Sequence, residues 1–127
     1  MAIINIINEF TVKNIDKAVK FYEDSFNFEV EETDGNPITW VQMKKGDVII
    51  MLEDYKEVIK EIDKFPIKTN TSNLVKFKYD NIEEVEEIYK NFKKKDIEFF
   101  MELKQTEYGT IEFGIFDLDK NMIIVSN

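Results

Sequence analysis

Hydrophobic and polar residues follow one order of periodicities, and that order occurs twice along the chain. Apolar and polar residues alternate in "NEFTV" at the end of 4–12 and in "VKFKY" at the end of 73–79, which predicts a strand in each place. After each strand comes an apolar stripe with the period of a helix, in "NIDKAVKFY" from Asn14 and in "NIEEVEEIY" from Asn81. The second copy begins 67 positions after the first, and each copy opens with an asparagine suited to cap a helix.

Three further strands are predicted after each helix. In the first half they are "FEVEE", "ITWVQMKK" and "DVIIMLED", the last two flanking Gly46 as in a hairpin, followed by a short helix that ends at Pro66. In the second half they are "IEFFMEL", "TIEFGIF" and "NMIIVS", with a tight turn at "DLDK" between the last two. A half of this size buries its sheet poorly alone, so the pattern indicates an internal duplication.

The predicted fold class is therefore α+β, built from two tandem βαβββ modules. We expect one domain over 1–127, with module one at about 1–65, a polar linker at about 66–72 and module two at about 73–127. Module two also carries acidic residues early in its helix and lysines late, as the helix dipole prefers.

Charge and composition limit the classes of molecule that the protein is expected to bind. The chain has 26 acidic and 17 basic residues, a net charge of −9, which disfavours nucleic acid and anionic membrane surfaces. Every basic residue is a lysine, so no guanidinium is present for bidentate binding of phosphate. There is no cysteine, and neither a long apolar run nor a signal-peptide pattern is visible, so we expect a cytoplasmic protein.

Several motifs in this order resemble the vicinal oxygen chelate superfamily, which groups glyoxalase I, extradiol dioxygenases and bleomycin resistance proteins. "NIDKAVKFYEDSFNFEV" is similar to its first-helix signature, and "YGTIEFGIFDLDKN" is similar to "YGxxEFxxxDPDGN" of the bleomycin-resistance-like branch. Leu118 and Lys120 replace the proline and glycine of that phrase. The resemblance implies paired modules whose sheets curl around a cleft with the helices outside, and it implies a homodimer.

The same resemblance raises the question of a metal site. Metal-using members place His or Glu at four cleft positions, which align here with Ile7, with Ile49 or Met51, with Leu74 and with Ile124. None of these side chains offers an imidazole or a carboxylate, and the chain has no histidine. We therefore expect no metal, no other cofactor and no catalytic residue of the metal-dependent type.

Hairpin geometry predicts which side chains share a sheet face. With Lys45 and Gly46 as the turn, Trp40 pairs with Met51 and Gln42 with Ile49, on a mixed face that also carries Glu53. The alternate residues are all apolar and should form core: Val41, Met43, Val48, Ile50 and Leu52.

The same count around "DLDK" pairs Phe113 with Ile124, so that an aromatic residue again faces an aliphatic one. On the first strands, Glu9 and Thr11 lie on the cleft side, and Lys76 is the duplicate of Glu9. The predicted ligand-binding residues are Glu9, Thr11, Trp40, Gln42, Ile49, Met51, Lys76, Tyr108, Phe113 and Ile124.

Each of these residues also has a purely structural interpretation. Trp40 as a lone tryptophan is suited to core packing, Met51 to gap filling and Tyr108 to the turn before Gly109. Glu9 and Lys76 are equally suited to an ion pair within the sheet.

The function that best fits these patterns is a non-enzymatic, metal-free binding protein of the glyoxalase/bleomycin resistance type. It would sequester a flat or cationic drug-like molecule against Trp40 and Phe113, since an acidic protein suits a cation. The alternative is a lyase or dioxygenase-like enzyme of the superfamily, which either has lost its metal site or uses an unorthodox carboxylate site near Glu9, Glu53 or Glu112. A third interpretation is an interaction module with a closed cleft.

Overall fold

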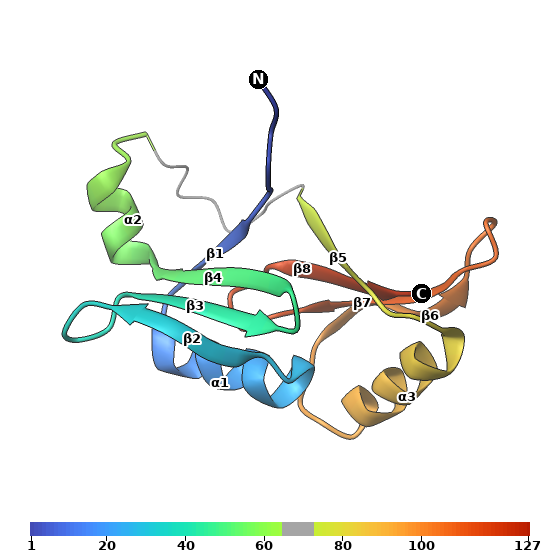
Figure 1. The fold of residues 1–127 in the computed structure, drawn as a ribbon. Coiled ribbons are helices and arrows are strands. Elements are labelled where there is room, and N and C mark those ends of the chain that lie inside the picture. Colours follow the sequence, from blue (N-terminus) through green and yellow to red (C-terminus); the bar gives the residue numbers. More distant parts are fainter. Residues whose placement is uncertain (65–72) are drawn as a thin grey trace. The chain divides into compact units, whose positions relative to one another are not determined.

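The computed structural model describes residues 1–64 and 73–127, which fall into two compact units, Met1–Ile67 and Lys68–Asn127. The predicted linker at 66–72 lies outside the described residues, as does Pro66. The second helix, which was expected to run as far as that proline, ends earlier, at Glu61. Each unit has its own four-stranded sheet and its own long helix (Figure 1).

The first unit contains a mixed sheet with strand order β1-β4-β3-β2. Its elements are β1 (Asn8–Val12), α1 (Ile15–Phe26), β2 (Glu29–Asp34), β3 (Trp40–Lys45), β4 (Val48–Asp54) and α2 (Tyr55–Glu61). Strand β1 runs parallel to β4, and the other neighbours are antiparallel. The strand expected over 4–12 begins only at Asn8, and the isoleucines that precede it are exposed.

Helix α1 covers one face of this sheet (Figure 1). The Asn14 side chain caps it by accepting a hydrogen bond from the Lys17 amide at 3.0 Å, as the sequence predicts. The helix ends at Asn27, whose left-handed backbone (φ 59°) lets its amide donate to the Glu23 carbonyl at 3.0 Å. Its buried residues pack against the apolar sheet residues Phe10, Val12, Val41, Met43, Ile50 and Leu52.

The second unit repeats the arrangement with strand order β5-β8-β7-β6. Its elements are β5 (Leu74–Lys78), α3 (Ile82–Lys93), β6 (Phe99–Gln105), β7 (Ile111–Phe116) and β8 (Met122–Ser126). Asn81 caps α3 by accepting from the Glu84 amide at 2.9 Å, and β5 runs parallel to β8 as β1 does to β4. The predicted α+β fold of two βαβββ modules is therefore confirmed.

Helix α3 is tied to β6 by a polar contact and to the sheet by aromatic rings. The Glu102 carboxylate accepts hydrogen bonds from the Tyr89 hydroxyl and, at 2.6 Å, from the Lys93 ammonium. Beneath the helix, the Phe113 ring lies 5.9 Å from the ring of Phe92 and 5.3 Å from that of Tyr89. These contacts place Phe113 in the core of the second unit.

The register of the β3–β4 hairpin differs from the prediction by two residues. Lys45 pairs with Val48, so Gly46 and Asp47 form the turn, and Trp40 lies opposite Glu53 rather than Met51. Ile49 correspondingly lies opposite Lys44 rather than Gln42. Because side chains alternate with a period of two, a shift of two leaves every residue on its predicted face.

The β7–β8 hairpin differs by one residue, which has a larger effect. Phe113 pairs with Val125, whereas Ile124 pairs with Gly114, because Lys120 takes a left-handed conformation (φ 65°) and lengthens the loop. A shift of one moves a residue to the other face of the sheet. The prediction that Phe113 shares a face with Ile124 is therefore wrong.

In the part of the chain that the structure describes, no helix has both the length and the apolar character needed to cross a bilayer.

Candidate functional site: the open faces of the two sheets

Each sheet has a face turned away from its long helix, which we call its open face. On the first sheet this face carries a mixed row of side chains, because Trp40 lies opposite Glu53, and Gln42 opposite Met51. On the neighbouring strand β1, Thr11 lies opposite Glu53, and Glu9 lies opposite Met51. Trp40, Gln42, Met51 and Glu53 are all half-buried, so their side chains are held by neighbours yet remain accessible.

A bulge in β2 adds a carboxylate to this face. Strand pairing between β2 and β3 shifts at Glu31, which has no partner residue across the ladder. The Gln42 amide donates to Glu31 Oε1 at 2.8 Å, and the Lys44 ammonium lies 3.5 Å from Oε2. The bulge thus fixes Glu31 beside Gln42 at the centre of the sheet.

Negative charge accumulates around Glu53. Partial burial and then the carboxylates of Glu9, Glu61 and Glu57 raise the pKa of Glu53. Within residues 1–64 and 73–127, neither Glu9 nor Glu53 has an ion pair or hydrogen bond through its side chain, whereas Glu57 is paired with Lys60 at 3.1 Å. A bound cation would lower the electrostatic cost of this arrangement.

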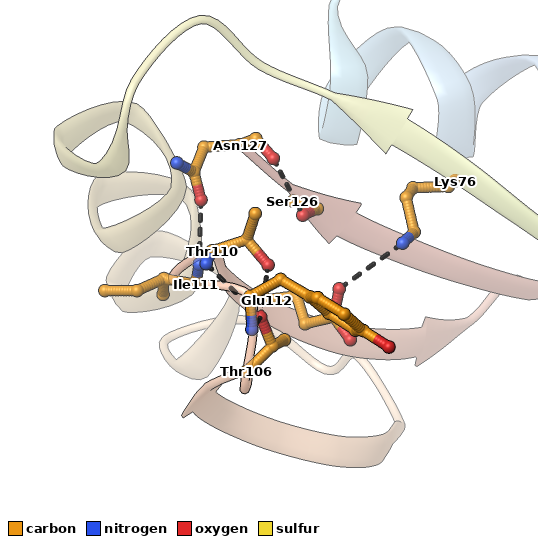
Figure 2. A network of polar contacts seen from close by, with 8 residues as sticks. Lys76, Thr106, Thr110, Ile111, Glu112, Ser126 and Asn127 are labelled. Atoms are coloured by element: carbon orange, nitrogen blue, oxygen red, sulfur yellow. Dashed lines mark hydrogen bonds and ion pairs between the residues drawn. The ribbon is translucent and has the colours of Figure 1, made fainter.

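The open face of the second sheet has the opposite charge on its first strand. Lys76 and Lys78 of β5 occupy the positions that Glu9 and Thr11 occupy in β1. The Lys76 ammonium lies 3.5 Å from Glu112 Oε2, a contact drawn in Figure 2. The Glu112 side chain is only 13% exposed, so this ion pair lies against the sheet rather than out in solvent.

The other end of this face is apolar. Phe100 is the unpaired residue of a bulge in β6, and its ring lies over Gly114, where an added Cβ would come within 2.3 Å of the ring. The Phe100 ring also lies 5.3 Å from that of Phe116, which pairs with Met122. The face therefore changes from lysines at one end to aromatic and aliphatic side chains at the other.

The β6–β7 loop borders the polar end. The hydroxyls of Thr106 and Thr110 lie 2.6 Å apart, and the Thr110 amide donates to Thr106 Oγ1 at 3.2 Å (Figure 2). The Asn127 side chain accepts a hydrogen bond from the Ile111 amide at 2.7 Å. Tyr108 at the tip is 91% exposed, in keeping with the turn role considered for it, and Gly109 follows with a positive φ of 86°.

Nine of the ten predicted ligand-binding residues lie on an open face or, in the case of Tyr108, on the loop beside it. Phe113 does not, because its side chain is fully buried under α3. Lys76 forms its ion pair with Glu112 of its own sheet. Strand alternation was sufficient to place the residues of β1, β3 and β4, since their faces do not depend on the exact turn.

Two residues of the open faces were missed from the sequence, Glu31 and Phe100. Each is the unpaired residue of a bulge, and each reaches over a residue of the neighbouring strand, Gln42 in one case and Gly114 in the other. Strand alternation alone does not reveal a bulge. The one available signal was the internal repeat, which aligns the two strands.

The residues at the family's metal positions do not suit a metal ion. Met51 and Ile124 lie on the open faces, opposite Glu9 and Lys76 on the parallel strands, and Ile7 and Leu74 precede or begin those strands. Aliphatic side chains provide no donor atom, and a thioether is a weak ligand for hard cations. Among the described residues, no group of three or more His, Cys, Asp or Glu side chains could hold a metal ion.

Comparison with known proteins agrees with this architecture. The family model described as "Glyoxalase/Bleomycin resistance protein/Dioxygenase superfamily" matches residues 3–125. No curated protein matches the chain.

Solved structures give the same fold at low sequence identity. A glyoxalase/bleomycin resistance protein/dioxygenase family enzyme from Burkholderia phytofirmans PsJN has a TM-score of 0.81 at 16% identity, covering 95% of each chain. A lactoylglutathione lyase from Agrobacterium tumefaciens has a TM-score of 0.78 at 22% identity, covering 96% of this chain and 91% of its own. TioX from Micromonospora sp. ML1 has a TM-score of 0.73 at 14% identity, covering 96% of each. At these identities the likeness establishes the fold.

Proposed function

Since this chain belongs to the glyoxalase/bleomycin resistance protein/dioxygenase superfamily, we propose that it is a metal-free protein that binds and sequesters a flat, cationic small molecule. The observation that carries the proposal is the half-buried Trp40 opposite Glu53, whose carboxylate and that of nearby Glu9 have no ion pair among the described residues. No catalytic step is assigned to the protein.

Trp40 is suited to hold a flat cation because an indole ring attracts positive charge to its face. Strand β3 fixes its backbone in the sheet, and the side chain points away from the core because its neighbours Val41 and Met43 are buried. Among the described residues no hydrogen bond or ring contact involves the Trp40 side chain. Its indole therefore has both an accessible surface and an unused N–H.

The carboxylates supply the preference for a cation. Glu53 lies directly opposite Trp40. The Glu9 carboxylate is among the groups that raise the pKa of Glu53. A ligand cation placed between ring and carboxylates would gain attraction from both and would remove the repulsion between the two acids. Affinity alone suffices for sequestration, so the loss of the family's metal ligands leaves this function intact.

Trp40 fluorescence provides the experiment. We expect titration with phleomycin, or with a small flat cation such as N-methylquinolinium, to change the emission of Trp40 in a saturable manner. Loss of the ring in Trp40→Ala should weaken binding by roughly 1–3 kcal/mol, or about tenfold to a hundredfold, while the protein remains folded. If Trp40 instead served the core, that substitution would cost roughly 3–5 kcal/mol of stability.

A matched pair of ligands separates charge from shape. Quinoline with an unmethylated, neutral ring has nearly the same outline as N-methylquinolinium, so Glu9→Gln should weaken binding of the cation and leave the neutral compound unaffected. Lys17→Gln, on the exposed surface of α1, serves as a control substitution. Equal affinity for the two compounds, or unchanged affinity in Trp40→Ala, would contradict the proposal.

Metal content distinguishes this function from that of a superfamily enzyme. We expect elemental analysis of the purified protein to find no stoichiometric Zn, Ni, Mn or Fe, because the four family positions carry no suitable donor. About one metal ion per chain retained through a mild chelator would favour the enzyme instead.

A further inference from the structure

The open face of the second sheet has a chemistry of its own, distinct from that of the Trp40 surface. Its side chains form three rows across the strands, and the first row contains Lys78, Ser126, Glu112 and Lys104 in register. The second contains Lys76, Ile124 and Gly114, and the third contains Leu74, Met122 and Phe116. We propose that this face is a second binding site, which takes a small amphipathic carboxylic acid.

The polar end of this face carries three lysines, Lys76, Lys78 and Lys104, and a single carboxylate, Glu112. Lys76 is paired with Glu112, but no ion pair or hydrogen bond of the Lys78 or Lys104 side chain occurs in the described part of the chain. The neighbouring acid on β6, Glu102, is bonded to Tyr89 and Lys93 of α3 on the opposite side. This end of the face therefore retains positive charge, in a chain whose net charge is −9.

The fold itself does not require these lysines. In the first unit the equivalent positions on β1 are Glu9 and Thr11, and β1 pairs with β4 in the same parallel arrangement. On the side of these two strands that faces the core, equivalent positions carry similar residues, such as Phe10 in β1 and Phe77 in β5. The exchange of an acid for a base on the open side alone is typical of a difference in what each face binds.

The apolar end provides a surface for the body of the ligand. Phe116 and Phe100 are half-buried on this face, the Phe100 ring lies over Gly114, and Ile124 on the same face is only 8% exposed. A flat apolar group could lie on these residues while its carboxylate reaches Lys76 and Lys78. Charge-assisted hydrogen bonds to ammonium groups would then fix its orientation.

The proposal is independent of the Trp40 function, because it concerns another sheet and a ligand of opposite charge. The test uses 2-naphthoate as the probe and 2-naphthamide as a neutral control of nearly the same shape. Both are titrated into the isotope-labelled full chain, with affinity and site read from amide chemical shifts.

We expect 2-naphthoate to shift resonances of β5, β7 and β8 and to bind about tenfold more tightly than the amide. Lys78→Gln should abolish that difference, since this lysine has no structural partner to lose. Lys90→Gln, which removes an exposed charge from α3 of the same unit, should preserve it. Phe100→Ala should weaken acid and amide alike.

Four results would overturn the proposal. They are equal affinity for acid and amide, shifts confined to residues outside the second sheet, an unchanged preference in Lys78→Gln, and no saturable binding of the acid up to about 1 mM. The Trp40 titration with a cation is unaffected by any of these, so failure of one proposal is distinguishable from failure of the other.

Discussion

Lys120 occupies a backbone conformation that few side chains adopt readily. Its φ of 65° is left-handed, a region where a Cβ costs roughly 1–2 kcal/mol relative to glycine. Around it, the Asp117 carboxylate accepts hydrogen bonds from the amides of Asp119 and Asn121 at 2.8 and 2.9 Å. "DLDKN" therefore uses its aspartate to hold the turn, and the lysine follows the path that the turn requires.

Substitution of Lys120 by glycine should relieve this strain. Lys120 also pairs with Glu98, so Lys120→Ala is the matched control, which loses the ion pair but keeps a Cβ. We expect Lys120→Gly to be more stable than Lys120→Ala by about 1 kcal/mol in urea denaturation. Equal stability of the two variants would show that the left-handed conformation costs nothing here.

Glu53 gives the first unit a pH dependence of definite sign. Because burial and neighbouring carboxylates raise its folded-state pKa above 4.5, the folded protein holds the proton more tightly than the unfolded chain does. Glu53 therefore lowers stability as the pH rises from 4.5 through the folded-state pKa. We expect Glu53→Gln to raise the free energy of unfolding at pH 7, with the gain fading as the pH falls to 4.5.

Glu102 provides the control of opposite sign. Hydrogen bonds from Lys93 and Tyr89 lower its pKa, so its charge favours folding above pH 4.5, and that contribution is lost as the pH falls through the lowered value. Glu102→Gln should therefore be less stable than the parent at pH 7 and approach it in acid. Parallel pH profiles for the Glu53 and Glu102 variants would contradict both assignments.

At the scale of elements, the two edge strands β2 and β6 carry bulges at equivalent places. Glu31 follows Val30, which pairs with Met43, and Phe100 follows Phe99, which pairs with Ile115. In both units the side chain at the bulge reaches over the next strand. The two halves therefore share the β-bulge, but it presents a carboxylate in one half and an aromatic ring in the other. The glycine at 114 makes room for the ring that the bulge supplies.

Adding a methyl group at Gly114 should reveal this contact. Gly114→Ala places a Cβ against the Phe100 ring, and such overpacking typically costs about 1–3 kcal/mol. In a Phe100→Ala background the same substitution should be neutral or stabilising, because glycine weakens a strand interior. A double-mutant cycle by urea denaturation measures the difference, and additive effects would mean that the ring moves aside freely.

The hairpins explain how far sequence could predict the open faces. In β3–β4 the turn was misplaced, yet Trp40 and Gln42 kept their predicted side, because the error was two residues. In β7–β8 the predicted register was wrong by one residue. Phe113 was therefore predicted on the open face, whereas the structure buries it in the core. The cause of this error is Lys120, since a lysine gives no signal of a left-handed backbone, whereas a glycine at that place would have given one.

The element pattern was more predictable than the site. The two long helices begin directly after the asparagines that the sequence marks, and alternation predicts the core residues Val41, Met43, Ile50 and Leu52 of β3 and β4. Val48, which was expected in the core, is 57% exposed because it lies next to the turn. The bulged residues, and the pairing of Lys76 with Glu112, depend on register and on side-chain reach across strands. These are properties of the assembled sheet that no local pattern encodes.

At the scale of the whole molecule, charge repulsion should weaken the folded state. With a net charge of −9, raising the ionic strength from about 0.01 to about 0.1 M shortens the screening length from about 30 to about 10 Å. We therefore expect thermal stability at pH 7 to rise with salt. Near the isoelectric point of about 4.6 the same salt step should have little effect, and an equal gain at both pH values would contradict this explanation.

Self-association is the second expectation at this scale. Sheet edges are exposed at β1, β2, β5 and β6 unless covered, and Ile3, Ile4 and Ile6 before β1 are 88%, 97% and 89% exposed. We propose a homodimer, so light scattering at micromolar concentration should give twice the chain mass of 15.1 kDa. A monomer mass under those conditions would count against it.

The matched bulges have a practical consequence for protein engineering. A bulged residue has no cross-strand partner, so its side chain is exchangeable without a change of strand register. Each one, together with the residue it covers, forms a two-residue cassette, Glu31 with Gln42 and Phe100 with Gly114. Transplanting a cassette from one half to the other would alter the chemistry of an open face while keeping its scaffold, which makes these four positions the natural starting points for redesigning specificity.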